Sequence, residues 1–145
     1  MTRPALGVDG ASSRRPLVSV ILTSYNYAQF IEQAIASVLA QTYEHMELII
    51  VDDGSSDGSP AVIEKAVKDA SIPVEILLQA NAGQGSALNA GYAKTSGEVI
   101  CLLDSDDYWY AEKVAHVVAF VELFPDGALY QHEMETGKGP KRAGM

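Results

Sequence analysis

The segment Asp104-Ser105-Asp106-Asp107 carries the residues best suited to chemistry, because three carboxylates follow an apolar run directly. Alternating carboxylates at the end of a strand can point oxygen atoms at one hard cation. Mg²⁺ and Mn²⁺ prefer oxygen ligands and often keep waters and substrate phosphates. Such a cation could bridge a diphosphate and stabilise the charge that develops on it as it leaves. A capped turn is the structural alternative, since Asp and Ser are common in turns.

Two further segments could contact a polar ligand. Asp52-Asp53-Gly54-Ser55 offers carboxylates that can accept the N3–H of uracil or a ribose hydroxyl, or that can simply cap the next helix. The stretch from Asn81 to Asn89 contains Gly83 and Gly85, which allow close approach of the backbone to a ligand. An ordinary strand-to-helix turn is the alternative for this stretch.

The elements that must position these residues follow from the apolar pattern. Short apolar runs predict buried strands, and apolar residues at helical spacing predict helices, with Ser59 as an N-cap and Pro60 in the first helical position. The strands are expected at 17–22, 47–51, 74–78, 99–103 and 128–132, and the helices at 30–39, 60–67, 86–93 and 112–124.

Strands that alternate with helices indicate an α/β fold with a mostly parallel sheet and helices on both faces. In such sheets the ligand crevice lies beyond the carboxyl ends of the strands. We therefore expect the segments after the first four strands to gather at one edge: 23–27, 52–57, 81–85 and 104–107.

Composition narrows the class of protein. The formal charge of −9 argues against a nucleic-acid partner, because phosphates would be repelled. The single cysteine, Cys101, excludes an internal disulfide and is expected to be a buried inert thiol. No apolar stretch reaches the ~20 residues of a membrane-spanning helix, and the N-terminus lacks the apolar segment of a secretory signal. A cytoplasmic location is the default expectation, extending to the inner face of the membrane. We expect a flexible leader at 1–15, one domain at 16–132 and an irregular tail at 133–145.

Four motifs in this order resemble the family-2 glycosyltransferases between Pro16 and Leu123. They are Val18-Ser19-Val20-Ile21 to Tyr25-Asn26, Ile50-Val51-Asp52-Asp53-Gly54-Ser55-Ser56-Asp57, Asn81 to Gly91, and Leu103-Asp104-Ser105-Asp106-Asp107. The resemblance implies a Rossmann-like GT-A fold and a nucleotide-sugar donor, usually a UDP sugar, whose glycosyl group is transferred with inversion.

The same resemblance implies roles for individual residues. Thr23 and Tyr25 would line the nucleotide pocket, and Asp52, with Asp53 beside it, would take the base. Asp104 would lie near the ribose, Asp106 would be the leading ligand of Mn²⁺ or Mg²⁺, and Asp107 could share either role. The remaining residues assigned to nucleotide-sugar binding are Asn81, Gly83 and Asn89.

The chain departs from the family pattern after the fourth motif. Family members continue into a half that supplies acceptor contacts and a carboxylate general base, whereas this chain ends at Met145. Glu133 and Glu135 are the only carboxylates near the C-terminal end of the chain, where the family has this base, and both are weak candidates for it. The expected chain is thus truncated before the acceptor half. Its saccharide or lipid-linked acceptor is unknown, and it either self-associates or works with a missing C-terminal half.

Three other functions compete with this interpretation. A dinucleotide-binding enzyme needs its glycine-rich turn after the first strand, where 23–27 contains no glycine. A haloacid-dehalogenase-type phosphatase would use Asp104 as nucleophile and Asp106 as acid–base, but it needs further motifs downstream. A non-catalytic donor-binding module or truncated remnant stays open. Trp109 is expected either to stack on a sugar or to pack at a helix start, and the three histidines show no metal-ligand spacing.

Overall fold

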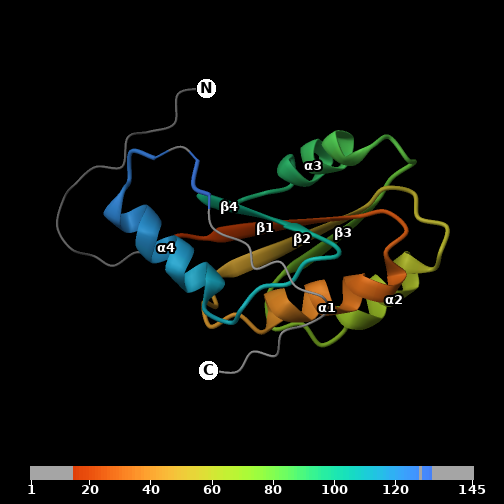
Figure 1. The fold of residues 1–145 in the computed structure, drawn as a ribbon, viewed down its shortest axis with the longest axis horizontal. Coiled ribbons are helices and arrows are strands. Elements are labelled where there is room, and N and C mark those ends of the chain that lie inside the picture. Colours follow the sequence, from red (N-terminus) through yellow and green to blue (C-terminus); the bar gives the residue numbers. More distant parts are fainter. Residues whose placement is uncertain (1–14, 128, 132–145) are drawn as a thin grey trace.

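Four strands and four helices alternate along the chain. The computed structural model describes residues 15–127 and 129–131. The elements are β1 (Val18–Ser24), α1 (Ala28–Leu39), β2 (Met46–Asp52), α2 (Ser59–Ala66), β3 (Val74–Leu78), α3 (Gln84–Tyr92), β4 (Val99–Asp104) and α4 (Lys113–Leu123). The strands form one parallel sheet in the order β3-β2-β1-β4, with β1 buried along its whole length (Figure 1). The predicted α/β fold is confirmed.

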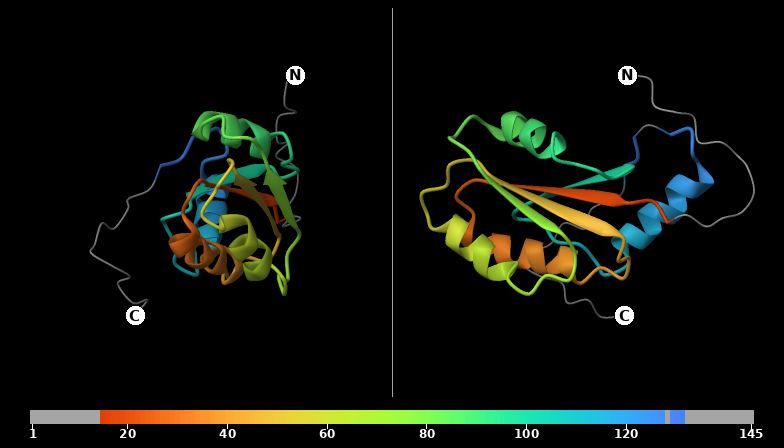
Figure 2. Two further views of the ribbon diagram at one scale, coloured as in Figure 1. Left: turned by 90° about the vertical axis from the view of Figure 1, so that its right-hand side faces the viewer. Right: turned by 180° about the vertical axis from the view of Figure 1, so that it is seen from behind.

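Helices cover both faces of this sheet, as predicted. One face packs against α1, α2 and α4 through a large core that includes Val20, Ile35, Leu48, Ile63 and Val118. The other face carries α3, whose Ala87 packs with Ile49 and Val51 of β2. Figures 1 and 2 show α3 alone on its side of the sheet, with α1 and α2 on the other. Because successive strand residues face opposite sides, β2 contributes to both cores, with Leu48 and Ile50 in one and Ile49 and Val51 in the other.

The Asp57 carboxylate accepts hydrogen bonds from the first residues of two helices. Its Oδ2 accepts a hydrogen bond from the backbone N–H of Ala28, the first residue of α1, at 2.9 Å. Its Oδ1 accepts from the N–H and the hydroxyl of Ser59, the first residue of α2, at 3.0 and 2.6 Å. The predicted cap at Ser59 is therefore wrong: Gly58 occupies the cap position with φ +89°, and Ser59 lies buried inside the helix. Hydrogen bonds from the Ser59 hydroxyl and the Ala28 N–H lower the pKa of Asp57.

Gln41 fastens the chain that returns from β4 to α4. Its Nε2 donates to the carbonyl oxygens of Ser37 and Tyr110, at 3.0 and 2.8 Å, and its Oε1 accepts from the N–H of Val114 at 2.9 Å. Thr42 adds a backbone hydrogen bond to the Ala111 carbonyl. A buried N–H at the start of α4 thus finds its acceptor at the end of α1.

The predicted fifth strand is absent from residues 129–131, which are described and carry no regular structure. Tyr130 instead folds back onto α4. Its ring packs edge-on against Phe120, with centroids 5.4 Å apart, and its hydroxyl donates to the Phe124 carbonyl. Ala128, His132, the 1–14 part of the predicted leader and the predicted tail lie outside the described residues.

The structure also bears on two expectations from composition, which concern membrane-spanning helices and the single cysteine. Within the described residues, no helix is long and apolar enough to cross a bilayer. Cys101 lies partly buried against the main core, and burial raises its pKa to about 11. The thiol therefore stays protonated at neutral pH, as expected for an inert cysteine.

Candidate functional site

The segments that follow the four strands meet at one edge of the sheet, on the right-hand side of Figure 1. Ser24 of β1 is level with Asp52 of β2, Asp52 is level with Leu78 of β3, and Thr23 is level with Asp104 of β4. Since all four strands are parallel, their polar extensions leave the sheet in the same direction.

The loops after β1 and β2 are joined by a short hydrogen-bond chain. Asn26 takes a left-handed conformation with φ +56°, which Asn tolerates better than most residues. Its Oδ1 accepts from the Ser56 N–H at 2.8 Å, and its own N–H donates to the Ser55 hydroxyl oxygen at 2.8 Å. The Ser55 hydroxyl in turn donates to Asp52 at 2.6 Å, so the two loops form one unit.

Asp53 joins the loop after β2 to the loop after β3. Its Oδ1 accepts from Gln79 Nε2 at 2.7 Å and from the Ala82 N–H at 2.9 Å, and its Oδ2 accepts from the Gly83 N–H at 2.9 Å. The side chain of Asn81 donates back to the Asp53 carbonyl at 3.1 Å. The hydrogen bonds from Gln79 and Ala82 lower the pKa of Asp53, so its carboxylate stays charged and holds the loop before α3.

Asp52 serves a different purpose from its neighbour. By strand alternation its side chain lies on the face of Leu48 and Ile50, which is covered by α1 and α2. Both carboxylate oxygens accept hydrogen bonds from Ser55, one from its N–H at 2.9 Å and one from its hydroxyl. Asp52 therefore closes the turn that begins the loop.

Gly54 permits the close approach of these two loops. Its φ is +79°, and an added Cβ would lie 2.7 Å from the backbone nitrogen of Asn81. Only glycine meets both requirements without displacing the loop after β3. Gly83 also has a positive φ, but a Cβ there, or at Gly85, would meet nothing within 4 Å. The start of α3 is thus open to an approaching ligand.

The acidic run lies beside that opening. The Asp107 N–H donates to the Asp104 carbonyl at 3.1 Å and closes a turn in which Ser105 is buried. Asp104 Oδ1 accepts from Gln84 Nε2, at the start of α3, at 3.1 Å. Burial first, and then the charges of Asp106 and Asp104, raise the pKa of Asp107. Three carboxylates here repel one another, which a bound cation would relieve.

The donor set fits a cation that shares its coordination with a ligand. Among the described residues, no group of three or more His, Cys, Asp or Glu side chains is arranged to enclose a metal ion. Mg²⁺ commonly binds through one or two carboxylates, with substrate phosphates and waters completing its shell. Asp106 and Asp107 are exposed and could supply such a partial set.

The remaining predicted site residues differ in burial and in position. Thr23 lies nearly buried beside Asp104, and Tyr25 is exposed at the rim of the edge. Asn89 is exposed on α3, whose buried residues are Ala87 and Gly91. Trp109 packs against the main core, in agreement with a packing role. Glu133 and Glu135 lie outside the described residues.

Two glutamines of the edge escaped the sequence prediction. Gln79 contacts Asp53, and Gln84 contacts Asp104, across 26 and 20 residues of chain. Neither residue belongs to a run of similar side chains. Glutamine is a common surface residue, so the sequence contains no signal that would single out either.

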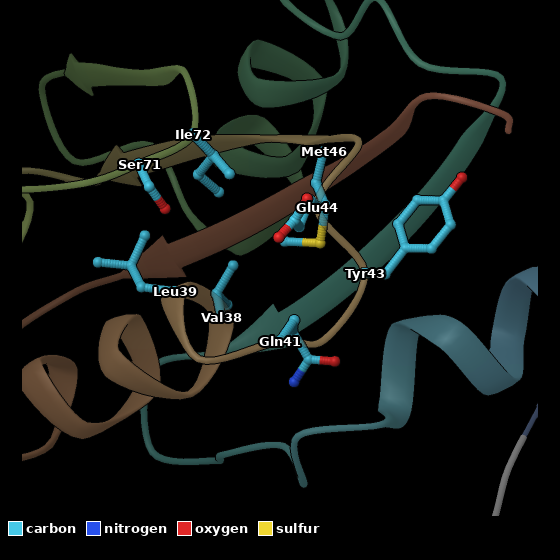
Figure 3. Close-up of a pocket in the computed structure, with 8 residues that line it drawn as sticks. All are labelled: Val38, Leu39, Gln41, Tyr43, Glu44, Met46, Ser71 and Ile72. Carbon is cyan, nitrogen blue, oxygen red and sulfur yellow. The ribbon is translucent and has the colours of Figure 1, made fainter.

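Two pockets in the described part of the chain lie away from this edge. One, of about 300 Å³, lies near the end of α1 and the start of β2, at the amino ends of the strands. Figure 3 shows its lining, which is mostly apolar apart from Gln41, Glu44 and Ser71. A second, of about 350 Å³, lies between α1 and α2 and is lined by Glu32, Ala36, Leu39, Ala40 and Ala66. Neither pocket is lined by the polar groups of the sheet edge.

Comparison with known proteins agrees with this arrangement. The model of glycosyl transferase family 2 matches residues 19–143. An uncharacterised glycosyltransferase of Nostoc sp. is 48% identical over 101 residues, which are 70% of this chain and 31% of the relative. TuaG of Bacillus subtilis, a glycosyltransferase named as a candidate for teichuronic acid biosynthesis, is 40% identical over 108 residues, 74% of this chain and 42% of TuaG. The chain thus spans less than half the length of these two relatives.

Solved structures give the same result at lower identity. The Pyrobaculum calidifontis mannosyltransferase PcManGT, in complex with GDP-Man and Mn²⁺, superposes with a TM-score of 0.71 and 27% identity. The match covers 75% of this chain and 33% of that enzyme. S. aureus TarS 1–349, in complex with UDP-GlcNAc, superposes with a TM-score of 0.68 and 27% identity, covering 73% of this chain and 31% of TarS 1–349. The parallel four-stranded sheet, the family match and the structural matches lead to the same conclusion. The chain has the GT-A fold and belongs to glycosyltransferase family 2.

Proposed function

We propose that this chain binds a nucleotide-sugar donor, a UDP sugar, at the carboxyl edge of its sheet. The complete protein would transfer the glycosyl group with inversion to a saccharide or lipid-linked acceptor. The observation that carries the proposal is the joining of three loops by Asp53 and Gln84, which places the glycine-rich start of α3 beside the acidic run. The UDP- and UDP-GlcNAc-bound forms of TarS support the choice of nucleotide, and GDP-Man in PcManGT makes guanine the alternative base.

We assign the contact with the base to Asp53 rather than to Asp52, because of the face of the sheet on which each side chain lies. Asp52 faces the layer of α1 and α2 and is engaged by Ser55. Asp53 lies among Gln79, Ala82 and Gly83, on the side of the open α3 start. A carboxylate has about four acceptor positions, and three are occupied here. The one that remains suits the single N3–H of uracil better than the paired N1–H and N2–H donors of guanine.

Thr23, Tyr25 and Asp104 complete the nucleotide site in this proposal. Tyr25 is exposed beside the joined loops and can cover the base or ribose, and Asp104 can accept a ribose hydroxyl. Asn81 and Gly83 shape the loop that faces the donor. A role for Asn89 remains a prediction from the sequence.

Asp106 and Asp107 would hold Mn²⁺ or Mg²⁺ together with the donor diphosphate. The cation, when bound, neutralises charge on the departing diphosphate. The protein's part is to present two carboxylates on a turn closed by the Asp107–Asp104 backbone hydrogen bond. PcManGT, a structural neighbour solved with GDP-Man and Mn²⁺, supports the use of a divalent cation.

Donor binding without turnover is the second candidate function. Transfer needs an acceptor hydroxyl that is deprotonated and aligned, and no described residue is assigned to that role here. The teichuronic acid assignment in the name of TuaG makes cell-wall polysaccharide synthesis the natural setting for the complete protein. A phosphatase function has no support in the comparisons.

Calorimetry of UDP binding tests the proposal. UDP should bind in the presence of Mn²⁺ and on the order of tenfold more weakly with a chelator, and Asp106→Ala should remove that difference. Asp69→Ala, at an exposed aspartate beyond α2, is the matched control and should behave like the parent chain. Equal UDP affinity with and without Mn²⁺ would exclude the metal assignment, and absence of UDP binding would exclude the donor site.

A further inference from the structure

Gln84 makes a contact that the proposed donor site does not yet use. It is the first residue of α3, and its Nε2 donates to Asp104 Oδ1 at 3.1 Å. The two residues come from the start of α3 and from the end of β4, and are separated by 20 residues of chain. The contact connects the glycine-rich loop directly to the first carboxylate of the acidic run.

The backbone that carries Gln84 is held in place. The preceding residues, Ala82 and Gly83, donate their N–H groups to the Asp53 carboxylate, which is only 4% exposed. On the other side, the Ala87 N–H donates to the Gly83 carbonyl at 3.1 Å and forms the first turn of α3. The Gln84 amide is therefore presented to Asp104 from a fixed point rather than from a free loop.

An amide suits this position because it orients a carboxylate without neutralising it. Arginine or lysine would form an ion pair with Asp104 and would compete with a cation nearby. A neutral N–H occupies one acceptor position of Asp104 Oδ1 and leaves the others for a ligand. Asp104 is exposed, so without this contact its side chain would sample several rotamers.

We infer that Gln84 is a positioning residue that holds the Asp104 carboxylate in the orientation that accepts a ribose hydroxyl of the donor. This inference rests on the proposed function, in which Asp104 contacts the ribose. In this role Gln84 acts through Asp104 and makes no contact of its own with the sugar or the diphosphate. Its effect should therefore be confined to the part of the affinity that depends on the ribose hydroxyls.

The test compares three ligands: UDP, 2′-deoxy-UDP and 3′-deoxy-UDP. Their dissociation constants are measured for the parent chain, Gln84→Leu, Asp104→Ala and the control Gln33→Leu, whose glutamine is exposed on α1. The parent should bind at least one deoxy ligand about three- to tenfold more weakly than UDP, as expected for one hydrogen bond. Gln84→Leu and Asp104→Ala should both lose most of this preference, whereas Gln33→Leu should keep it.

The outcomes separate this inference from the proposed function. Gln84→Leu with the parent's preference for UDP would overturn the positioning role. Equal weakening of all three ligands by Gln84→Leu would also overturn it, because that is the signature of a general structural defect. A parent that binds UDP but does not distinguish the deoxy ligands would refute the ribose role of Asp104 and this inference, leaving donor binding intact. A parent that binds no UDP would refute the proposed function itself. Gln84→Ala, which keeps a strong helix former at the start of α3, repeats the test if the leucine variant folds poorly.

Discussion

The adjacent residues Asp52 and Asp53 have different hydrogen-bond partners, because successive side chains along a strand point to opposite faces of the sheet. Asp52, the last residue of β2, shares the α1 and α2 face and is engaged by Ser55. Asp53, one residue later, binds the loop that precedes α3. One carboxylate closes its own turn and the other joins two loops of the proposed donor site. A single acidic motif therefore contains one carboxylate that closes a turn and one that joins two loops.

Substitution of these two aspartates should separate the two jobs. Asp53→Asn replaces an acceptor by a group that also donates, which mismatches both the Ala82 and Gly83 N–H groups and the N3–H of uracil. We expect UDP affinity to fall about fivefold or more for Asp53→Asn and less for Asp52→Asn. Calorimetry with UDP, together with a melting curve for each variant, measures both effects. If both variants bind UDP like the parent, the base pocket lies elsewhere.

The same carboxylates should make the fold sensitive to acid. Hydrogen bonds lower the folded-state pKa values of Asp53 and Asp57 below the unfolded value of about 3.9. A lowered folded pKa stabilises the fold above the unfolded pKa, and this contribution is lost as the pH falls through the folded pKa. Urea unfolding at neutral pH and at several values below about pH 4 should therefore show a stability loss that is smaller in Asp53→Asn and Asp57→Asn. An unchanged acid profile in both variants would show that other groups control the loss.

At the scale of elements, α3 reaches the sheet only because one of its residues has no side chain. A Cβ at Gly91 would lie 2.7 Å from Ile21 Cγ2 and 3.2 Å from Val51 Cγ2. The helix thus packs directly on β1 and β2, and this close packing fixes where its first turn meets the donor edge. Gly85, in the first turn of the same helix, has open space around it instead.

A pair of alanine substitutions tests this packing. Gly91→Ala forces a methyl group into Ile21 and Val51 and should destabilise the fold by about 1–3 kcal/mol, despite the better helix propensity of alanine. Gly85→Ala meets no neighbour and should be neutral or stabilising by up to about 1 kcal/mol. Chemical denaturation of both variants measures the difference. A Gly91→Ala variant as stable as Gly85→Ala would mean that α3 sits farther from the sheet.

At the scale of the whole molecule, the β4 edge of the sheet has no further strand paired to it within the described residues. Within 15–127 and 129–131, β4 has β1 as its only strand neighbour, and Leu102 on β4 is 58% exposed. Further apolar side chains lie exposed at the end of α4 and beyond: Phe120, Leu123, Phe124 and Leu129. The segment from Val99 to Leu103 contains no charge that would oppose pairing with another strand.

We therefore expect the 145-residue chain alone to self-associate and to turn over donor slowly. Light scattering should give a mass above the 15.5 kDa of one protomer, and Leu102→Lys on the edge strand should lower it. Tyr92→Lys, at an exposed aromatic of α3, is the control and should leave the mass unchanged. UDP should be released from a UDP sugar only slowly with any acceptor offered, because no described residue is assigned as general base for the acceptor hydroxyl. A stable monomer that glycosylates an acceptor rapidly would contradict this prediction.

Much of the fold was determined by local patterns in the sequence. Each of the four strand-and-helix pairs through Leu123 was predicted within about two residues of its observed bounds, because each has an apolar run or stripe long enough to select one period. The collection of polar loops at one edge followed from parallel topology alone. The predicted fifth strand failed because an aromatic contact between Tyr130 and Phe120, invisible as a local pattern, returns that segment to α4.

What only the tertiary structure decided is which polar groups meet. The strand order β3-β2-β1-β4 brings the loops after β1 and β2 together and places Asp104 beside Thr23. Asp57 contacts Ala28, Asp53 contacts Gly83, and Gln84 contacts Asp104, each across 20 or more residues. A hydrogen bond requires correct distance and direction, and both depend on how whole helices pack on the sheet. The sequence therefore determined which helices and strands form and at which edge of the sheet the polar loops lie. The hydrogen-bond partners of each carboxylate were determined by the packing of the helices on the sheet.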